Sequence, residues 1–431
     1  MLLQSNAHRR ISLLTLLTLL ALLACAGRRP ALPTAAPETV GLSREGLSRI
    51  TDAMQAYIDS GKVGGVYAVI VRDGRIGYER TFGWSDMERR KPMRRNAVFR
   101  IFSMTKPIVA AGALRLVDQG KLSLDDPVAK YIPSFANVQV FAGGSALAPE
   151  VRPPASPVTI RHLLTHTSGL GYGLTRQPAD SIFTRAALYQ PGVTLEQFVD
   201  SVAKLPLLFS PGTHWSYSSG LEVVGRIIEV ISGQTLDRFL ESQLFEPLGM
   251  TNTSFRYRDD LDRRTTVLYA PGRDGRLHVV TGGLMAMYEP SARFLWASGG
   301  LLSTPDDFMR FAQMLLNGGE LGGVRVLSAA SVAEMTRHQL TPEQTLEARE
   351  AMLDDGYGFG LAGSVLLEPA SPAAGAAGIY RWSGYVGTYF WIDPRNRLLA
   401  MVWTQLNPGR AYPLESDFQK LVYDALLPPA N

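Results

Sequence analysis

The stretch Val98-Phe99-Arg100-Ile101-Phe102-Ser103-Met104-Thr105-Lys106 joins a short apolar segment to the start of a helix. Periodic apolar residues predict that this helix runs from about Ser103 to Gly120. Residues three apart share one face of a helix, so the Lys106 amine can reach the Ser103 hydroxyl. Burial and the positive end of the helix dipole would lower the pKa of Lys106. A neutral amine there can accept the serine proton, so the stretch predicts a nucleophile at a strand-to-helix junction.

The same four-residue pattern occurs a second time, at Ser201 and Lys204. This pair falls well inside a helix that Thr194 and Gln197 begin with a capping box. It lies away from the positive end of the helix dipole, and we interpret it as part of the surface. The Ser-x-x-Lys pattern alone is therefore a weak indication of a catalytic serine, and its place in the predicted secondary structure must be considered as well.

Outward from Ser103, strands are predicted near both ends of the chain. A helix over 43–61 precedes a hairpin with its turn at Asp73-Gly74. Thr304-Pro305-Asp306-Asp307 is typical of a helix start. Strands are also predicted over 379–382, 387–392 and 398–404, before a last helix. The pattern indicates an α+β fold, an α/β sandwich in which helices flank one antiparallel sheet and a mainly helical domain is inserted.

Residues 41–125 and 285–431 are predicted to form a discontinuous α/β domain, and residues 126–284 a mainly helical one. The Pro/Ala-rich residues 28–40 are expected to be a linker. Residues 134–158, rich in Pro, Gly and Ala, are expected to be an inserted loop that borders the cleft.

Residues 1–27 have the pattern of a signal peptide, because Arg9 and Arg10 precede an apolar run that is too short to cross a bilayer. Ala24-Cys25-Ala26 fits a cleavage site between small residues, whereas residues 22–25 resemble a bacterial lipobox with Cys25 as the acylated residue. We expect an exported protein, either periplasmic or anchored as a lipoprotein, with membrane contact only through such an anchor.

The composition narrows the classes of function. The chain has 431 residues, 46% hydrophobic and 19% charged, with a formal net charge of +4. Acidic residues are interspersed among the basic ones, which disfavours a nucleic-acid partner. The single cysteine excludes a disulfide framework and a thiolate metal cluster. No serine lies in a complete G-x-S-x-G, and no P-loop or Rossmann fingerprint is present.

Several segments, in order, resemble class C β-lactamases, penicillin-binding DD-peptidases and their esterase relatives, the β-lactamase/transpeptidase-like family. Together they cover most of residues 45–405. The segments are Phe99 to Lys106, Leu163-Leu164-Thr165-His166-Thr167-Ser168-Gly169-Leu170, Phe209-Ser210-Pro211-Gly212-Thr213 leading to Tyr217-Ser218-Ser219, Gly299-Gly300-Leu301 with Ser303, Thr304 and Asp307, and Gly384 to Phe390.

The resemblance implies that Ser103 is acylated, with Lys106 as its partner and Tyr217 sharing the acid/base work. A tyrosine serves as a base only if its pKa is lowered, and Lys106 is expected to do this. The resemblance also implies an oxyanion hole formed by the backbone N–H groups of Ser103 and Tyr385. No cofactor and no metal ion are implied.

The segment Trp382-Ser383-Gly384 departs from the Lys-Thr-Gly of β-lactamases and DD-peptidases. Related esterases commonly carry a tryptophan there, so this segment is expected to bind neutral acyl esters with short or aromatic groups. Arg381 should point to the opposite face of the strand and not replace the lost charge. Ser219 stands where β-lactamases carry an asparagine. It either hydrogen-bonds an acyl group or caps a helix as a capping box with Glu222.

His162 and His166 have a metal-compatible spacing, but no glutamate lies between them and no third ligand follows nearby, so structural roles are favoured. The sequence thus predicts a serine carboxylesterase that forms an acyl-enzyme, with weak β-lactam hydrolysis as an added possibility, acting on a small-molecule ester or amide. A β-lactamase or DD-peptidase, and a non-catalytic binding protein on the same fold, remain alternatives.

Overall fold

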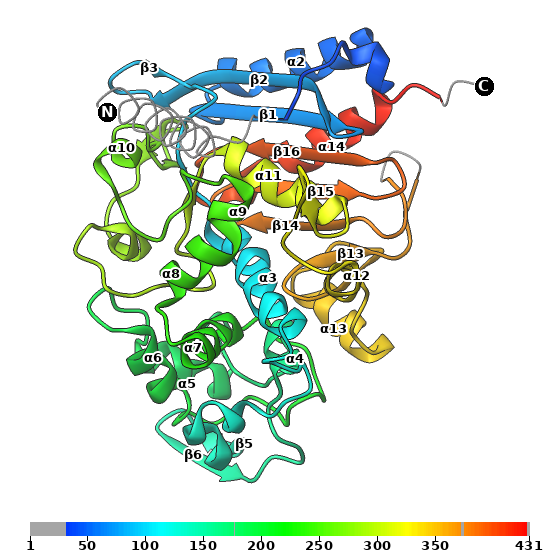
Figure 1. Cartoon of the computed structure of the whole chain (residues 1–431). Helices are drawn as coiled ribbons and strands as arrows, with labels where there is room; N and C mark the ends of the chain where they lie inside the picture. The colour runs from blue at the N-terminus through cyan, green and yellow to red at the C-terminus, as the bar shows by residue number, and fades with distance from the viewer. Residues whose placement is uncertain (1–31, 176, 372–374, 429–431) are drawn as a thin grey trace, which may run out of the picture.

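The computed structural model describes residues 32–175, 177–371 and 375–428, and its centre is an eight-stranded sheet (Figure 1). The strand order is β12-β13-β14-β15-β16-β1-β2-β3, and every neighbouring pair is antiparallel. This confirms the predicted α+β class. The strands are β1 (Gly65–Arg72), β2 (Arg75–Asp86), β3 (Lys91–Pro92), β12 (Tyr357–Phe359), β13 (Ser364–Leu366), β14 (Tyr380–Gly384), β15 (Thr388–Asp393) and β16 (Leu398–Trp403).

Helices cover both faces of this sheet (Figure 1). The strands β15 and β16 are buried throughout, as an almost continuous apolar run requires when both faces are covered. Phe308 of α11 (Pro305–Leu316) packs on Phe390, whereas Phe418 of α14 (Leu414–Asp424) packs on Trp391. Because neighbouring strand residues point to opposite faces, these contacts place α11 and α14 on opposite sides. Helix α2 (Arg44–Asp59) packs beside α14.

Local capping signals begin several of these helices as predicted. The Ser43 hydroxyl accepts a hydrogen bond from the Gly46 N–H at the start of α2. Thr304 caps α11 in the same way, and Thr194 forms the expected capping box with Gln197. Each cap satisfies backbone N–H groups that the first turn leaves without a helical partner.

The central helix α3 (Thr105–Asp118) lies between the sheet and a second, helix-rich part of the molecule (Figure 1). The division at residues 125 and 285 stays a prediction, although most elements between these positions are helical. These elements are β5 (Val140–Ser145), β6 (Ala148–Arg152), α4 (Ile160–Leu164), α5 (Pro178–Ala186), α6 (Leu195–Val202), α7 (Gly220–Ser232), α8 (Leu236–Leu240), α9 (Glu246–Leu248), α10 (Asp259–Asp262), β7 (Tyr269–Pro271) and β8 (Leu277–Val279). The remaining strands and α-helices are β4 (Phe99–Arg100), β9 (Leu302–Ser303), β10 (Glu320–Leu321), β11 (Val324–Arg325), α12 (Ala329–Thr336) and α13 (Pro342–Ala351).

Part of the expected linker belongs to the folded body. Thr34 forms a β-bridge with Ile76, Pro37–Val40 is a short 3-10 helix, and Val40 is buried. Although the Pro/Ala-rich composition predicts a linker, burial of Val40 against β2 holds this segment on the sheet. The predicted signal peptide, with Cys25, lies outside the described residues. Within the described ranges, no helix has the length and apolar character of a membrane span.

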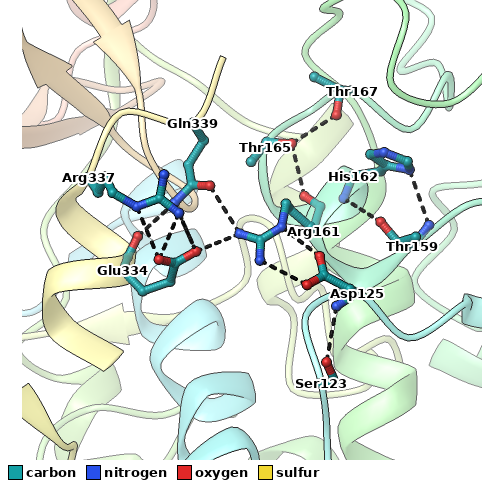
Figure 2. Close-up of polar contacts among 10 residues, drawn as sticks. All are labelled: Ser123, Asp125, Thr159, Arg161, His162, Thr165, Thr167, Glu334, Arg337 and Gln339. Carbon is teal, nitrogen blue, oxygen red and sulfur yellow. Dashed lines mark hydrogen bonds and ion pairs between the residues drawn. The ribbon is translucent and has the colours of Figure 1, made fainter. Parts of the chain in front are cut away.

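Arg161 of α4 connects the helix-rich part to α12 (Figure 2). Its guanidinium pairs with Asp125 at 2.8 Å and with Glu334 of α12 at 2.5 Å, and it donates to Gln339 at 3.1 Å. Arg337 binds Glu334 from the other side. Three chain segments, which contain Asp125, Arg161 and Glu334, are thereby held together.

Candidate active site

Ser103 lies where the short strand β4 turns into α3. The turn Phe102–Met104 is a 3-10 helix, and Phe102 has a φ of +43°. A non-glycine residue in this region is uncommon and marks a backbone held by its surroundings. The structure therefore places Ser103 at the predicted strand-to-helix junction.

Three polar side chains from distant parts of the sequence meet at this turn. The Ser103 Oγ lies 3.2 Å from the Lys106 Nζ and accepts a hydrogen bond from the Tyr217 hydroxyl at 2.9 Å. Tyr217 comes from the loop that precedes α7. The structure thus brings together the three residues that were predicted to be catalytic.

Lys106 is fully buried, and its Nζ also donates to the backbone carbonyl of Ser298 at 2.8 Å. Burial lowers the pKa of Lys106, because removal from water penalises the charged amine. The negative charge of the buried Glu222 acts in the opposite direction. An amine with a lowered pKa is able to accept the Ser103 proton at moderate pH.

The expectation that Lys106 lowers the pKa of Tyr217 is wrong. Burial raises the pKa of Tyr217 well above its ordinary value of about 10, and the nearby Tyr172 raises it further. The Lys106 Nζ lies over the face of the Tyr217 ring, 4.7 Å from its centroid. Tyr217 is therefore a neutral phenol that donates to Ser103 in the resting enzyme.

The end of β14 forms an edge beside Ser103. Strand β13 pairs with β14 only at Tyr380 and Arg381, which leaves Trp382–Gly384 unpaired on that side. A Cβ atom at Gly384 would lie 2.4 Å from the Ile101 carbonyl oxygen, so only glycine allows this close approach. The approach brings Tyr385 to the cleft that Ser103 lines, as the predicted oxyanion hole requires.

A cleft of about 240 Å³ opens over Ser103 and this edge. The indole of Trp382 forms one wall and packs against Tyr217 and Phe359, with ring centroids 5.9 and 5.2 Å apart. The lining residues are Ser103, Tyr217, Met352, Leu353, Asp354, Ser364, Arg381, Trp382, Ser383, Gly384, Tyr385, Tyr389, Pro408, Gly409 and Arg410. The predicted substrate-binding residues 382–384 thus all border the cleft.

Arg381 also borders the cleft, contrary to expectation, because the cleft continues around the free edge of β14. Its guanidinium stacks on the Tyr357 ring at 3.4 Å, donates to the Tyr389 hydroxyl at 3.2 Å and pairs with Asp354. The charge of Arg381 is therefore matched by a carboxylate, and it does not stand in for the missing lysine of a Lys-Thr-Gly.

Ser219 is not brought into the cleft. It is buried, and its hydroxyl donates to the Gly171 carbonyl at 3.0 Å. It does not form the expected capping box either, because its side chain makes no cap hydrogen bond and Glu222 points toward Ser298. Both side chains therefore bond to residues that are distant in the sequence, Gly171 and Ser298, and not to each other's backbone.

The structure also places the expected inserted loop and the two histidines. Residues 138–152 of the expected loop contain the hairpin β5–β6, far from the sheet (Figure 1), and no residue of 134–158 lines the cleft. His162 accepts from the Thr159 N–H in a capping box, and His166 contacts the Ser218 hydroxyl at 3.1 Å. Both histidines thus have structural partners. Within residues 32–175, 177–371 and 375–428, no cluster of three potential metal ligands occurs.

Three functional candidates beyond the predicted set lie behind Lys106: Ser298, Glu222 and Tyr172. The Ser298 hydroxyl donates to Glu222 and lies 2.9 Å from the Tyr172 hydroxyl. The capping box expected of Glu222 is wrong because it considers sequence neighbours only, whereas the hydroxyl partner Ser298 is 76 residues away. The only signal for Ser298 is its position directly before Gly299-Gly300.

Comparison with known proteins agrees with this geometry. A model of the Beta-lactamase family matches residues 50–423, which is most of the chain. The protein belongs to the Beta-lactamase family. Esterase EstB of Burkholderia gladioli is 32% identical, over 90% of this chain and 98% of that protein. Lovastatin esterase of Penicillium rubens is 31% identical, over 80% of this chain and 89% of that protein.

Among solved structures, the chain is similar to EstCE1, a hydrolase with promiscuous acyltransferase activity. It superposes with a TM-score of 0.77 at 26% identity, over 88% of this chain and 99% of that one. The resemblance inferred from the sequence is confirmed.

Proposed function

We propose that this protein is a serine carboxylesterase that works through an acyl-enzyme. The observation that carries the proposal is the position of the Ser103 Oγ, 3.2 Å from a buried amine and 2.9 Å from a phenol, at the floor of a cleft. A nucleophile within hydrogen-bond reach of its base is the arrangement that covalent catalysis needs. The named esterases among the relatives support the same chemistry.

In acylation, the Ser103 proton passes to the neutral Lys106 as Oγ bonds to the ester carbonyl carbon. The carbonyl electron pair moves to oxygen, where the N–H groups of Ser103 and Tyr385 stabilise the negative charge. Collapse of this intermediate breaks the bond to the alkoxy group. The alcohol then leaves with the proton that Lys106 had accepted.

In deacylation, water takes the place of the alcohol and the proton steps run in reverse. Lys106 accepts the water proton, and the Ser103 Oγ leaves as the group that is protonated. Tyr217 donates its hydrogen bond to Oγ throughout and begins and ends neutral. It stabilises the alkoxide character of Ser103 when the serine departs.

The walls of the cleft favour neutral esters. Trp382 supplies an apolar surface where a lysine would attract a carboxylate, and Arg381 is paired with Asp354. Met352 and Leu353 extend the apolar lining. We therefore infer a preference for short-chain or aromatic acyl groups over β-lactams and D-Ala-D-Ala peptides.

The test compares three substrates: p-nitrophenyl butyrate, a chromogenic cephalosporin and a D-Ala-D-Ala peptide. We expect the ester to be turned over fastest, and Ser103→Ala to lose at least about 10³-fold in kcat. Ser201→Ala is the matched control and should keep full activity. Mass spectrometry should show an acyl adduct on Ser103.

Each alternative has its own outcome in this test. Cephalosporin or peptide turnover above ester turnover would make the protein a β-lactamase or a DD-peptidase. Binding of all three without turnover or adduct would make it a binding protein. Ester turnover that survives in Ser103→Ala would refute the nucleophile.

We also propose that the protein is exported, from the charged and apolar pattern of residues 1–27. Cell fractionation and mass spectrometry of the mature N-terminus test this. A lipid-modified Cys25 identifies an anchored lipoprotein, cleavage at the small residues a periplasmic protein, and an intact N-terminus in the cytoplasm contradicts export.

A further inference from the structure

A fully buried glutamate lies directly behind the candidate catalytic cluster. Glu222 belongs to the first turn of α7, and its Oε1 accepts hydrogen bonds from the Ser298 and Tyr189 hydroxyls. Its Oε2 is buried and has no hydrogen-bond partner among the described residues. A buried carboxylate is costly unless a positive charge faces it, so this position calls for an explanation.

Ser298 connects this carboxylate to the base. Its carbonyl oxygen accepts from the Lys106 Nζ at 2.8 Å, while its hydroxyl donates to Glu222. Tyr172 holds the same hydroxyl from the other side, at 2.9 Å. One residue therefore hydrogen-bonds to both the lysine and the glutamate.

Lys106 is the cation that faces Glu222 within the described part of the chain. Burial raises the pKa of each neighbouring tyrosine, which keeps these phenols neutral. His166 is neutral as well, because burial and Lys106 hold its pKa well below the ordinary range. The titratable groups around the pair are Tyr172 and Tyr189 from the segments flanking α5, Tyr217 before α7 and His166 after α4.

We propose that Glu222 is a positioning residue for acyl transfer, which orients Lys106 through Ser298 and supplies the negative charge that balances this lysine when it is protonated. It does not contact Ser103, and its role rests on the proposed function. The carboxylate favours the step in which the Ser103 proton arrives on Lys106, because the resulting ammonium then has a buried counter-charge.

Each charge of this buried pair acts on the pKa of the other group. The form with a neutral lysine and a charged glutamate is the one that accepts the serine proton with a counter-charge in place. Burial raises the pKa of Glu222 and lowers that of Lys106, whereas each opposite charge acts against that shift. Loss of the carboxylate leaves only the burial effect on Lys106, so its pKa falls further.

The experiment measures kcat and KM for p-nitrophenyl butyrate, and the rate of Ser103 labelling by a fluorophosphonate, across pH. On the acidic side of both pH profiles, activity falls as Lys106 becomes protonated, and we call this part of the profile the acid limb. In Glu222→Gln we expect the acid limb of both profiles to move by at least one pH unit to lower pH. We also expect the plateau kcat to fall about tenfold, with KM within twofold. Glu222→Asp keeps the charge and should keep the limb within a few tenths of a unit.

Glu229→Gln is the matched control, because Glu229 is another largely buried glutamate of α7, paired with Arg226 and away from Lys106. It should leave the limb and kcat unchanged. An acid limb that stays in place in a folded Glu222→Gln would overturn the proposal. If wild-type protein labels at Ser103 but hydrolyses no ester, the proposed function fails while the labelling profiles still test Glu222.

A second variant covers the case in which Glu222→Gln does not fold. Ser298→Ala removes the hydroxyl that holds Glu222 but keeps the carbonyl that holds Lys106. We expect at least a fivefold loss of kcat with KM within twofold. An unchanged kcat in Ser298→Ala would overturn the positioning role.

Discussion

The chain contains two Ser-x-x-Lys sequences with opposite fates. Ser103 precedes α3, and its partner Lys106 is fully buried 3.2 Å from the serine hydroxyl. The pair does not fall well inside a helix as expected, because α6 ends at Val202 and Lys204 lies beyond it. Ser201 donates to the Gln197 carbonyl of its own helix at 2.7 Å, while Lys204 is exposed. Identical spacing therefore gives a candidate active site in one place and surface structure in the other.

The difference lies in what surrounds each pair. Burial changes the pKa of Lys106, and tertiary neighbours bring a phenol and an edge strand to the Ser103 hydroxyl. The spacing of a motif determines which side chains can contact each other. Burial determines their pKa values, and therefore which of them can accept a proton.

The largest expected effect contrasts the two lysines. Lys106→Met should lower kcat/KM for p-nitrophenyl butyrate by about 10³-fold or more, because the serine loses its proton acceptor. Lys204→Met should stay within twofold of wild type. The comparison breaks if both variants lose activity, or if neither does.

The Tyr217 hydroxyl contacts Ser103 and, among the described residues, has no counterpart at Ser201, so its removal tests this difference between the two motifs. Tyr217→Phe should lower kcat about 10²-fold with little change in KM, since the ring stack with Tyr172 (5.7 Å between centroids) remains. Tyr78→Phe loses only a 3.1 Å contact with Thr51 and serves as the control. Full activity in Tyr217→Phe would limit this phenol to packing.

A single methyl group tests the edge strand beside Ser103. Gly384→Ala places a Cβ about 2.4 Å from the Ile101 carbonyl oxygen, so the β14 end must shift and carry the Tyr385 N–H with it. We expect about a tenfold loss of kcat, measured on folded protein, together with a lower melting temperature because the overpacked strand end must move. Gly192→Ala, with open space around its Cβ, should have no effect on kcat.

The smallest expected effect concerns Glu415, a buried carboxyl group outside the candidate active site, whose burial should affect stability. Burial raises the pKa of Glu415 in α14 to about 7, so folded protein keeps a proton that the unfolded chain releases near pH 4.5. Stability should therefore fall as pH rises from 4.5 to 7. Glu415→Gln should gain roughly 1–3 kcal/mol relative to wild type at pH 8 and almost nothing at pH 4. Thermal unfolding measures this, and an equal gain at both pH values would contradict it.

Local signals in the sequence predicted local structure well. Ser43 and Thr304 cap helices through residues three positions away, and the α3 start places Lys106 beside Ser103. Such features depend on neighbours within one helical turn. The resemblance to a known family supplied Tyr217, which periodicity alone would have assigned to packing.

The features that sequence reasoning missed depend on distant contacts. Ser219 and Glu222 fit a capping box locally, yet Gly171 and Ser298 provide their partners. The direction of the Tyr217 pKa shift follows from burial that no sequence spacing reveals. Arg381 is the last β14 residue paired with β13, and it borders the cleft because the cleft extends past the point where this pairing ends.

The pairing of β1 with β16 has a consequence for biosynthesis. Tyr67 lies opposite Trp403, so β1 can pair with β16 only after the long intervening segment has been translated. Ser103 emerges soon after β1, but the backbone of Tyr385 and the carbonyl of Ser298 arrive much later. During translation, Ser103 is therefore present before the other parts of its site, and hydrolytic activity would appear only after the segments with Ser298 and Tyr385 have been added.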